Sequence, residues 1–280
     1  MDWRKLMFVL PNLFTVSSIF CGFYAITLCS GDATPKDLYT AAIAIFFAMF
    51  FDGFDGRVAR LTRTQSEFGV ELDSLADVMS FGLAPALLVY KWALYNLGFL
   101  GLFLSFVFAS CGALRLARFN VMAHRRVPGS SRFFTGLPIP LAAGMIVALV
   151  IAHYNAALSP IEAGTPAPAL LAVVVTVLAL LMVSNVRYRT FKDLRLSKRS
   201  ATVFLVIVLA GIAVATQMPP AFVLVAYFSA YLLLGLAEGI VGLTRRQPAP
   251  LAVAVAEEGG AAESVGLEDD EDEDEGEEYI

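Results

Sequence analysis

DGFDGRVAR at residues 52–60 and GVELDSLAD at residues 69–77 place four aspartates at the ends of two apolar segments. Asp52 and Asp55 are three residues apart, and Asp73 and Asp77 are four apart. In a helix, each pair therefore lies on one face, about one turn apart. Four carboxylates on facing helical turns repel one another unless cations lie between them. The two stretches therefore predict a pair of helices that together hold a divalent-cation site.

The composition indicates that this site lies in a membrane. The chain has 280 residues, of which 58% are hydrophobic and 16% charged, and its mean hydropathy is +0.71. These values exclude an ordinary soluble domain. Eight apolar stretches reach or approach the ~20 residues that cross a bilayer. They lie at about 7–29, 39–60, 74–91, 93–114, 134–154, 169–186, 200–216 and 221–243. The prediction is an all-α integral membrane protein with eight transmembrane helices.

The basic residues predict how the helices are oriented. With the N-terminus in the cytoplasm, every Lys and Arg except Lys36 and Lys91 falls on the cytoplasmic side. Cytoplasmic segments of membrane proteins carry such an excess of positive charge. Both termini are then cytoplasmic, and the four aspartates lie at the cytoplasmic ends of the second and third helices. We expect a multi-pass protein of the cell (inner) membrane whose active site faces the cytoplasm.

The C-terminal segment differs in composition from the rest of the chain. Residues 247–280 begin with Pro, Ala and Val and then carry thirteen acidic residues, eight of them in the run EDDEDEDE. Such a segment cannot bury enough apolar surface to fold. The predicted domains are therefore a transmembrane domain at 1–246 and a disordered acidic tail at 247–280. The tail either stays in solvent or docks on the basic loops.

The spacing of the aspartates resembles a known family. It reads D-x2-D-G-x2-A-R-x8-G-x3-D-x3-D, with every fixed position filled, and is similar to the signature of the CDP-alcohol phosphotransferase family. The resemblance implies an enzyme that transfers a phosphatidyl group from a CDP-linked lipid to an alcohol and releases CMP. It implies that Asp52, Asp55 and Asp73 bind one divalent ion, that Asp52, Asp73 and Asp77 bind a second, and that Asp77 is the general base. Oxygen ligands beside a phosphate favour Mg²⁺ or Mn²⁺.

The same stretch supplies candidates for binding the CDP-lipid. Small residues on the stripe of the aspartates leave room for a nucleotide, and basic or hydroxyl side chains nearby can contact its phosphates. These candidates are Gly56, Ala59, Arg60, Arg63, Thr64, Ser66 and Gly69. The small residues have a second interpretation, because they also let helices pack closely in lipid.

The acceptor alcohol must be chosen by other segments. Five of them resemble membrane-type phosphatidylserine synthases of bacteria and archaea: Leu10–Thr15, Ser80–Pro85, Ala113–Asn120, Phe134–Pro140 and Met182–Lys192. The resemblance implies L-serine as acceptor, CDP-diacylglycerol as donor, membrane lipids as surroundings, a homodimer and no nucleic-acid partner. Free serine needs a cation for its carboxylate, and the candidates for serine or phosphate binding are Arg115, Arg118, Asn120, Arg189 and Lys192.

Two alternatives remain open at the level of sequence. Glycerol 3-phosphate or inositol phosphate would also suit basic loops, so charge alone does not select serine. A divalent-cation transporter is the alternative from another class, because acids inside membranes often mark ion paths. The clustering of these acids at one interface, beside Arg60, favours the enzyme.

Overall fold

The computed structural model describes most of the predicted transmembrane domain. The described residues are 3–62, 66–124, 133–156, 161, 166–184, 187–189, 222–230 and 232–233, with the side chains of 3–11, 59–60, 123–124, 133–135 and 187–189 excepted. All of them belong to one compact unit, Met1–Gly239. The predicted span 200–216, the tail 247–280 and the candidates Arg63, Thr64 and Lys192 lie outside the described residues.

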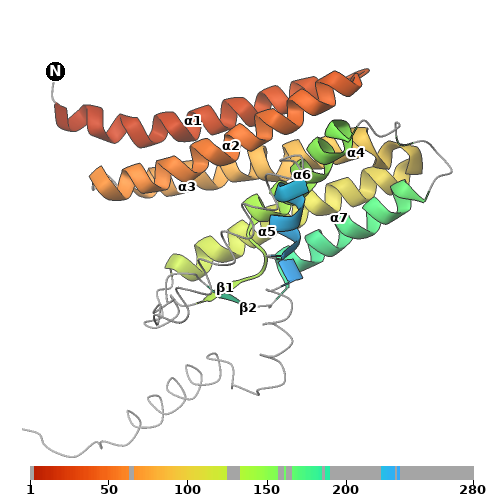
Figure 1. Ribbon diagram of the computed structural model, residues 1–280. Helices are drawn as coiled ribbons and strands as arrows, with labels where there is room; N and C mark the ends of the chain where they lie inside the picture. The colour runs from red at the N-terminus through yellow and green to blue at the C-terminus, as the bar shows by residue number, and fades with distance from the viewer. Residues whose placement is uncertain are drawn as a thin grey trace, which may run out of the picture. The chain divides into compact units, whose positions relative to one another are not determined.

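The first two helices form an antiparallel pair. Helix α1 spans Trp3–Cys29 and α2 spans Pro35–Thr62, and they lie side by side in Figure 1. The start of α2 is capped reciprocally, since the backbone N–H of Thr34 donates to Asp37 Oδ2 (2.9 Å) and that of Asp37 to Thr34 Oγ1 (3.3 Å). Pro35 occupies the first helical turn, where no N–H is needed. The aspartates of the first stretch therefore lie near the C-terminal end of α2.

The next span is one long helical segment with an irregular centre. Helix α3 covers Glu67–Asp77, a π-helical segment, η1, covers Val78–Leu83, and α4 covers Ala84–Trp92. Asp77 is thus the last residue before the π-helical segment, a type of irregularity found often at functional sites. The Ser80 hydroxyl donates to the carbonyl of Ser18 on α1 (3.0 Å). This bond ties η1 to the first helix.

The remaining described elements complete the bundle. A 3₁₀ turn, η2, covers Leu94–Leu97, and α5 covers Phe99–His124, followed by α6 at Ile139–Asn155 and α7 at Ala167–Val183. Two short strands, β1 (Phe133–Thr135) and β2 (Arg187–Arg189), pair antiparallel with Phe134 opposite Tyr188. Residues 222–230 and 232–233 are also helical. The fold is helical as predicted, except that the all-α prediction does not contain this two-stranded ribbon.

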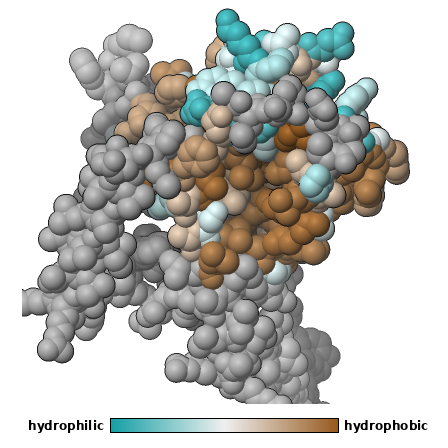
Figure 2. All heavy atoms as spheres, turned by 45° about the vertical axis from the view of Figure 1, so that its right-hand side comes forward, coloured by the Kyte–Doolittle hydropathy of each residue, from teal (hydrophilic) through white to brown (hydrophobic). Residues whose placement is uncertain are grey.

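Among the described residues, four helical segments are long and apolar enough to cross a membrane. They are Asn12–Cys29, Pro35–Val58, Glu67–Trp92 and Phe99–Met122, whereas α6 and α7 are apolar but have 17 residues each. Figure 2 shows a surface that agrees with this, because apolar residues cover most of the described part of the face and hydrophilic residues gather at one end. The predicted stretch 93–114 starts too early, because Ala93–Gly98 form the 3₁₀ turn and its flanks. The described helices are those of a membrane protein.

Candidate metal centre and its surroundings

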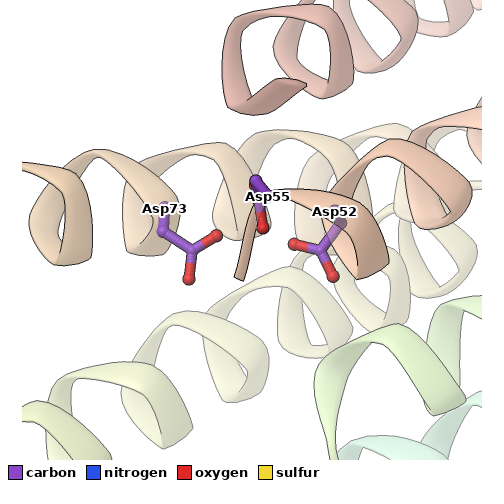
Figure 3. Close-up of side chains that lie close together, drawn as sticks. All are labelled: Asp52, Asp55 and Asp73. Atoms are coloured by element: carbon purple, nitrogen blue, oxygen red, sulfur yellow. The ribbon is translucent and has the colours of Figure 1, made fainter. Parts of the chain in front are cut away.

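Three of the four aspartates converge where α2 and α3 face each other. Asp52 and Asp55 come from α2 and Asp73 from α3, and one carboxylate oxygen from each lies within 4.8 Å of the others. Figure 3 shows the three side chains pointing into the same space. Asp55 is buried, with 6% of its surface exposed. The predicted first ligand set is therefore brought together, and it can hold a metal ion.

Asp55 is held by hydrogen bonds to both of its oxygens. Its Oδ2 accepts from the Thr15 hydroxyl of α1 at 3.0 Å. Its Oδ1 accepts from the backbone N–H of Gly56. The orientation of this carboxylate is therefore fixed by the protein itself.

The two aspartates of α3 are less well satisfied. The Oδ1 atoms of Asp73 and Asp77 are both buried, and neither has a hydrogen-bond partner among the described residues. A buried carboxylate oxygen without a partner is unfavourable by about 1–3 kcal/mol or more. An all-oxygen set with unpaired buried oxygens suits a hard divalent cation, so the residues present fit the metal that the family resemblance implies.

Asp77 stands slightly apart from the other three. Its carboxyl lies close enough to Asp52 for a hydrogen bond when one of the two is protonated, and close enough to Asp73 and Arg115 to interact with their charges. In the described part of the chain, Asp52, Asp55 and Asp73 offer carboxylate oxygens that all lie within 4.8 Å of one another, and Asp77 is not part of this group. The second ligand set, with Asp77 as a member, stays a prediction.

The glycines of the motif differ in the space around them. A Cβ added at Gly56 would meet nothing within 4 Å, whereas one at Gly69 would lie 3.2 Å from Ser66 Oγ and 3.6 Å from Asn12 Oδ1. Among the described residues, the space beside Gly56 is thus open, while at Gly69 protein atoms lie close by. Nucleotide binding at either glycine stays a prediction. Ser66 itself caps α3, because its hydroxyl oxygen accepts from the N–H of Gly69 at 3.1 Å. Ala59 and Arg60 lie in α2, with side chains outside the described set.

Helix α5 brings a buried basic residue to the site. Arg115, 9% exposed, is the residue whose charge acts on Asp77. Arg118 is exposed and donates to the carbonyl of Val183 (3.4 Å) at the end of α7. Among the candidates for serine or phosphate binding whose side chains are described, Arg115 is therefore a basic residue placed beside the aspartates.

Two further candidates for serine or phosphate binding are Asn120 and Arg189. Asn120 donates from Nδ2 to Ser74 Oγ at 3.0 Å, which links α5 to the helix of Asp73 and Asp77. Arg189 lies in β2, with a side chain outside the described set.

Sequence reasoning missed the contribution of α1. The Thr15 hydroxyl donates to Asp55, and the backbone carbonyl of Ser18, three residues further along α1, accepts from the Ser80 hydroxyl. Both residues are almost fully buried, at 4% and 1% exposed. The residue type gave an indication at Thr15 alone, since every residue has a backbone carbonyl like the one that Ser80 uses at Ser18.

Comparisons with known proteins agree with this geometry. The CDP-alcohol phosphatidyltransferase family model matches residues 8–177. The chain is similar to a CDP-diacylglycerol–serine O-phosphatidyltransferase of Helicobacter pylori, with 41% identity over 193 residues, which are 68% of this chain and 75% of that protein. It is 36% identical over 183 residues to the enzyme of that name from Bacillus subtilis, covering 65% of this chain and 91% of the relative.

An archaeal relative extends the comparison. The archaetidylserine synthase of Methanothermobacter thermautotrophicus is 34% identical over 181 residues, which are 64% of this chain and 69% of that protein. The family match includes most of α1, all of α2 to α6 and most of α7, and so contains all four aspartates. The chain belongs to the CDP-alcohol phosphatidyltransferase family.

Proposed function

We propose that this protein is a CDP-diacylglycerol–serine O-phosphatidyltransferase, which converts CDP-diacylglycerol and L-serine to phosphatidylserine and CMP. The observation that carries the proposal is the convergence of Asp52, Asp55 and Asp73 with Asp77 and Arg115 beside them. The names of the relatives from Helicobacter pylori and Bacillus subtilis support serine as the acceptor.

The donor lipid binds at the aspartates. Asp52, Asp55 and Asp73 hold one divalent ion, Mg²⁺ or Mn²⁺, and Asp52, Asp73 and Asp77 hold a second. Bound there, the metal supplies charge stabilisation for the pyrophosphate and for departing CMP. The open space at Gly56 gives the cytidine room to lie against α2. Further contacts to the CDP-lipid come from the remaining candidates, Ala59, Arg60, Arg63, Thr64, Ser66 and Gly69.

Asp77 and Arg115 act on the acceptor. The serine hydroxyl gives its proton to the Asp77 carboxylate as its oxygen bonds to the lipid-side phosphorus, and the bond from that phosphorus to the CMP oxygen breaks. Arg115 binds the serine carboxylate, because a buried guanidinium beside Asp77 is placed to hold the carboxylate while the hydroxyl reaches the base. Arg118, Asn120, Arg189 and Lys192 have a secondary part in binding serine or phosphate.

The proposed membrane arrangement rests on the apolar stretches and on the distribution of basic residues. Eight spans place both termini and the aspartates on the cytoplasmic side of the inner membrane, where serine and CMP are soluble. Residues 1–246 form the transmembrane domain, residues 247–280 a disordered acidic tail, and two chains form a homodimer.

The test is release of CMP by the purified full-length protein in detergent. CDP-diacylglycerol is supplied with Mn²⁺ or Mg²⁺, and serine, glycerol 3-phosphate, inositol phosphate or no acceptor is added in parallel. Stimulation by serine alone, with phosphatidylserine as the product, is the expected result. Release driven by a phosphorylated acceptor would overturn the choice of serine but keep the chemistry. Absence of release with every acceptor would overturn the enzyme assignment in favour of cation transport.

A further inference from the structure

We propose that Thr15 of α1 is a positioning residue of the metal centre, because its hydroxyl sets the orientation of the Asp55 carboxylate. The proposal rests on the proposed function to the extent that the latter makes the aspartate cluster a metal site. It assigns a role to the first helix, which contributes no ligand of its own.

The Thr15 hydroxyl reaches a side chain on another helix. Ser17 donates to the carbonyl of Leu13 (2.8 Å), and Thr27 donates to that of Tyr24 (2.7 Å), so both of these bonds stay within α1. Such local bonds are usual for Ser and Thr inside a helix. Thr15 donates across to Asp55 Oδ2 on α2, 40 residues away in the chain.

The bond lies where it can control the metal centre. Asp55 Oδ2 accepts from Thr15 and Oδ1 from the N–H of Gly56. A carboxylate oxygen has two lone-pair directions, so each bond leaves one direction for a cation. Together the two donors fix the rotation of the carboxylate, and Asp55 then points toward Asp52 and Asp73.

The burial of Thr15 makes the bond hard to replace. Its side chain is 4% exposed, so water has little access to the Asp55 oxygen that it serves. Removing the hydroxyl leaves Asp55 with one donor and frees its carboxylate to turn. Loss of a partner that orients a metal ligand costs about tenfold to a hundredfold in metal affinity.

Paired variants isolate the hydroxyl. Thr15→Val keeps the shape of the wild-type side chain and removes its oxygen. Thr15→Ala and Thr15→Ser form a second pair that differs by one oxygen, and this pair decides the matter if the valine variant does not fold. Thr27→Val is the matched control, because it removes a hydroxyl from the same helix that bonds only to its own backbone.

The readout is Mn²⁺ affinity, measured on the full chain in detergent by electron paramagnetic resonance of free Mn²⁺. We expect Thr15→Val and Thr15→Ala to bind about tenfold or more weakly, with Thr15→Ser and Thr27→Val close to wild type. Equal affinity in Thr15→Ala and Thr15→Ser, or in Thr15→Val and wild type, would overturn the proposal.

A parallel CMP-release assay separates this proposal from the proposed function. If the wild-type protein releases CMP with serine but the paired variants bind Mn²⁺ equally, the role of Thr15 is wrong and the enzyme assignment stands. If loss of the Thr15 hydroxyl weakens Mn²⁺ binding but the wild-type protein releases no CMP, the positioning role stands and the enzyme assignment is wrong. Wild-type protein that binds no Mn²⁺ overturns the positioning role.

Discussion

The two helices that supply the aspartates hold their carboxylates in different ways. On α2, Asp55 accepts hydrogen bonds on both oxygens, from Thr15 and from Gly56. On α3, Asp73 and Asp77 each have a buried oxygen without a partner among the described residues. A carboxylate with its hydrogen bonds made keeps its orientation without ligand, whereas a buried unpaired oxygen is stabilised only when a ligand arrives. Asp55 on α2 is thus preorganised, whereas Asp73 and Asp77 on α3 depend on what binds.

The packing around the two helices explains the difference. Helix α1 lies along α2 and places Thr15 against Asp55. The α3 side instead ends at Asp77, where the π-helical segment begins, and it is located through the bond from Ser80 to Ser18. Changes on the α3 side should therefore affect chemistry and substrate binding, and changes on the α1 contacts should affect geometry and stability.

The largest effect is expected at Asp77. Asp77→Asn removes the proposed base but leaves the first ligand set of Asp52, Asp55 and Asp73 in place. The kcat should therefore fall about 10²–10⁴-fold, while Mn²⁺ binding at that first set is retained. Steady-state CMP release and Mn²⁺ binding measure the two effects on one preparation. Asp73→Asn is the comparison variant and should lose both. If Asp77→Asn bound Mn²⁺ as poorly as Asp73→Asn, the loss of kcat would report loss of metal, and the assignment of Asp77 as base would lose its support.

A smaller effect is expected at Arg115. Arg115→Ala should raise the KM for serine roughly tenfold or more, because a hydrogen bond to a charged group contributes about 1.5–3 kcal/mol. The KM for CDP-diacylglycerol should change less. Arg118→Ala is the comparison variant: Arg118 is exposed, donates to the end of α7 and has only a secondary part in binding, so its loss should raise the KM for serine less than Arg115→Ala does. Equal increases in both KM values would contradict serine binding by Arg115, and Arg115→Lys tests whether charge alone is enough.

The sequence could predict the aspartate cluster because its geometry is local. Spacings of three and four residues place each pair on one helical face, and the structure confirms that Asp52, Asp55 and Asp73 converge. The apolar stretches predicted the first four spans for a similar reason, since length and hydropathy are local properties. The roles of the individual site residues stay predictions.

The rest depended on contacts between distant segments. The bond from Thr15 to Asp55 requires knowing which face of α1 packs on α2, and the pairing of β1 with β2 joins segments more than fifty residues apart. The π-helical segment lies where Ser80 approaches α1 at Gly22, a contact between residues far apart in the chain. Motif spacing carries no information about any of these contacts.

The contact between Gly22 and Ser80 offers a test through stability. A Cβ at Gly22 would lie 2.5 Å from Ser80 Oγ and 2.8 Å from Ser80 Cα, so α1 and the π-helical segment would have to separate. Gly22→Ala should destabilise the protein by about 1–3 kcal/mol, as overpacking does. Thermal unfolding in detergent measures the effect. Gly53→Ala is the control, because nothing lies within 4 Å of its Cβ position. Equal unfolding temperatures would show that this crossing is not tightly packed.

The smallest effect is expected at Gly56, and it decides between the two interpretations of the small residues. Its Cβ position is open, so Gly56→Ala should leave stability unchanged or raise it by up to about 1 kcal/mol, the gain of helix propensity. If the cytidine lies there, the added methyl group should nevertheless raise the KM for CDP-diacylglycerol severalfold, with the KM for serine unchanged.

Gly53→Ala again provides the control, since Gly53 is equally open but does not share the stripe of Asp52 and Gly56. A KM increase in Gly56→Ala and not in Gly53→Ala would locate the nucleotide on the aspartate face of α2. Identical KM values in both variants would contradict nucleotide binding at Gly56.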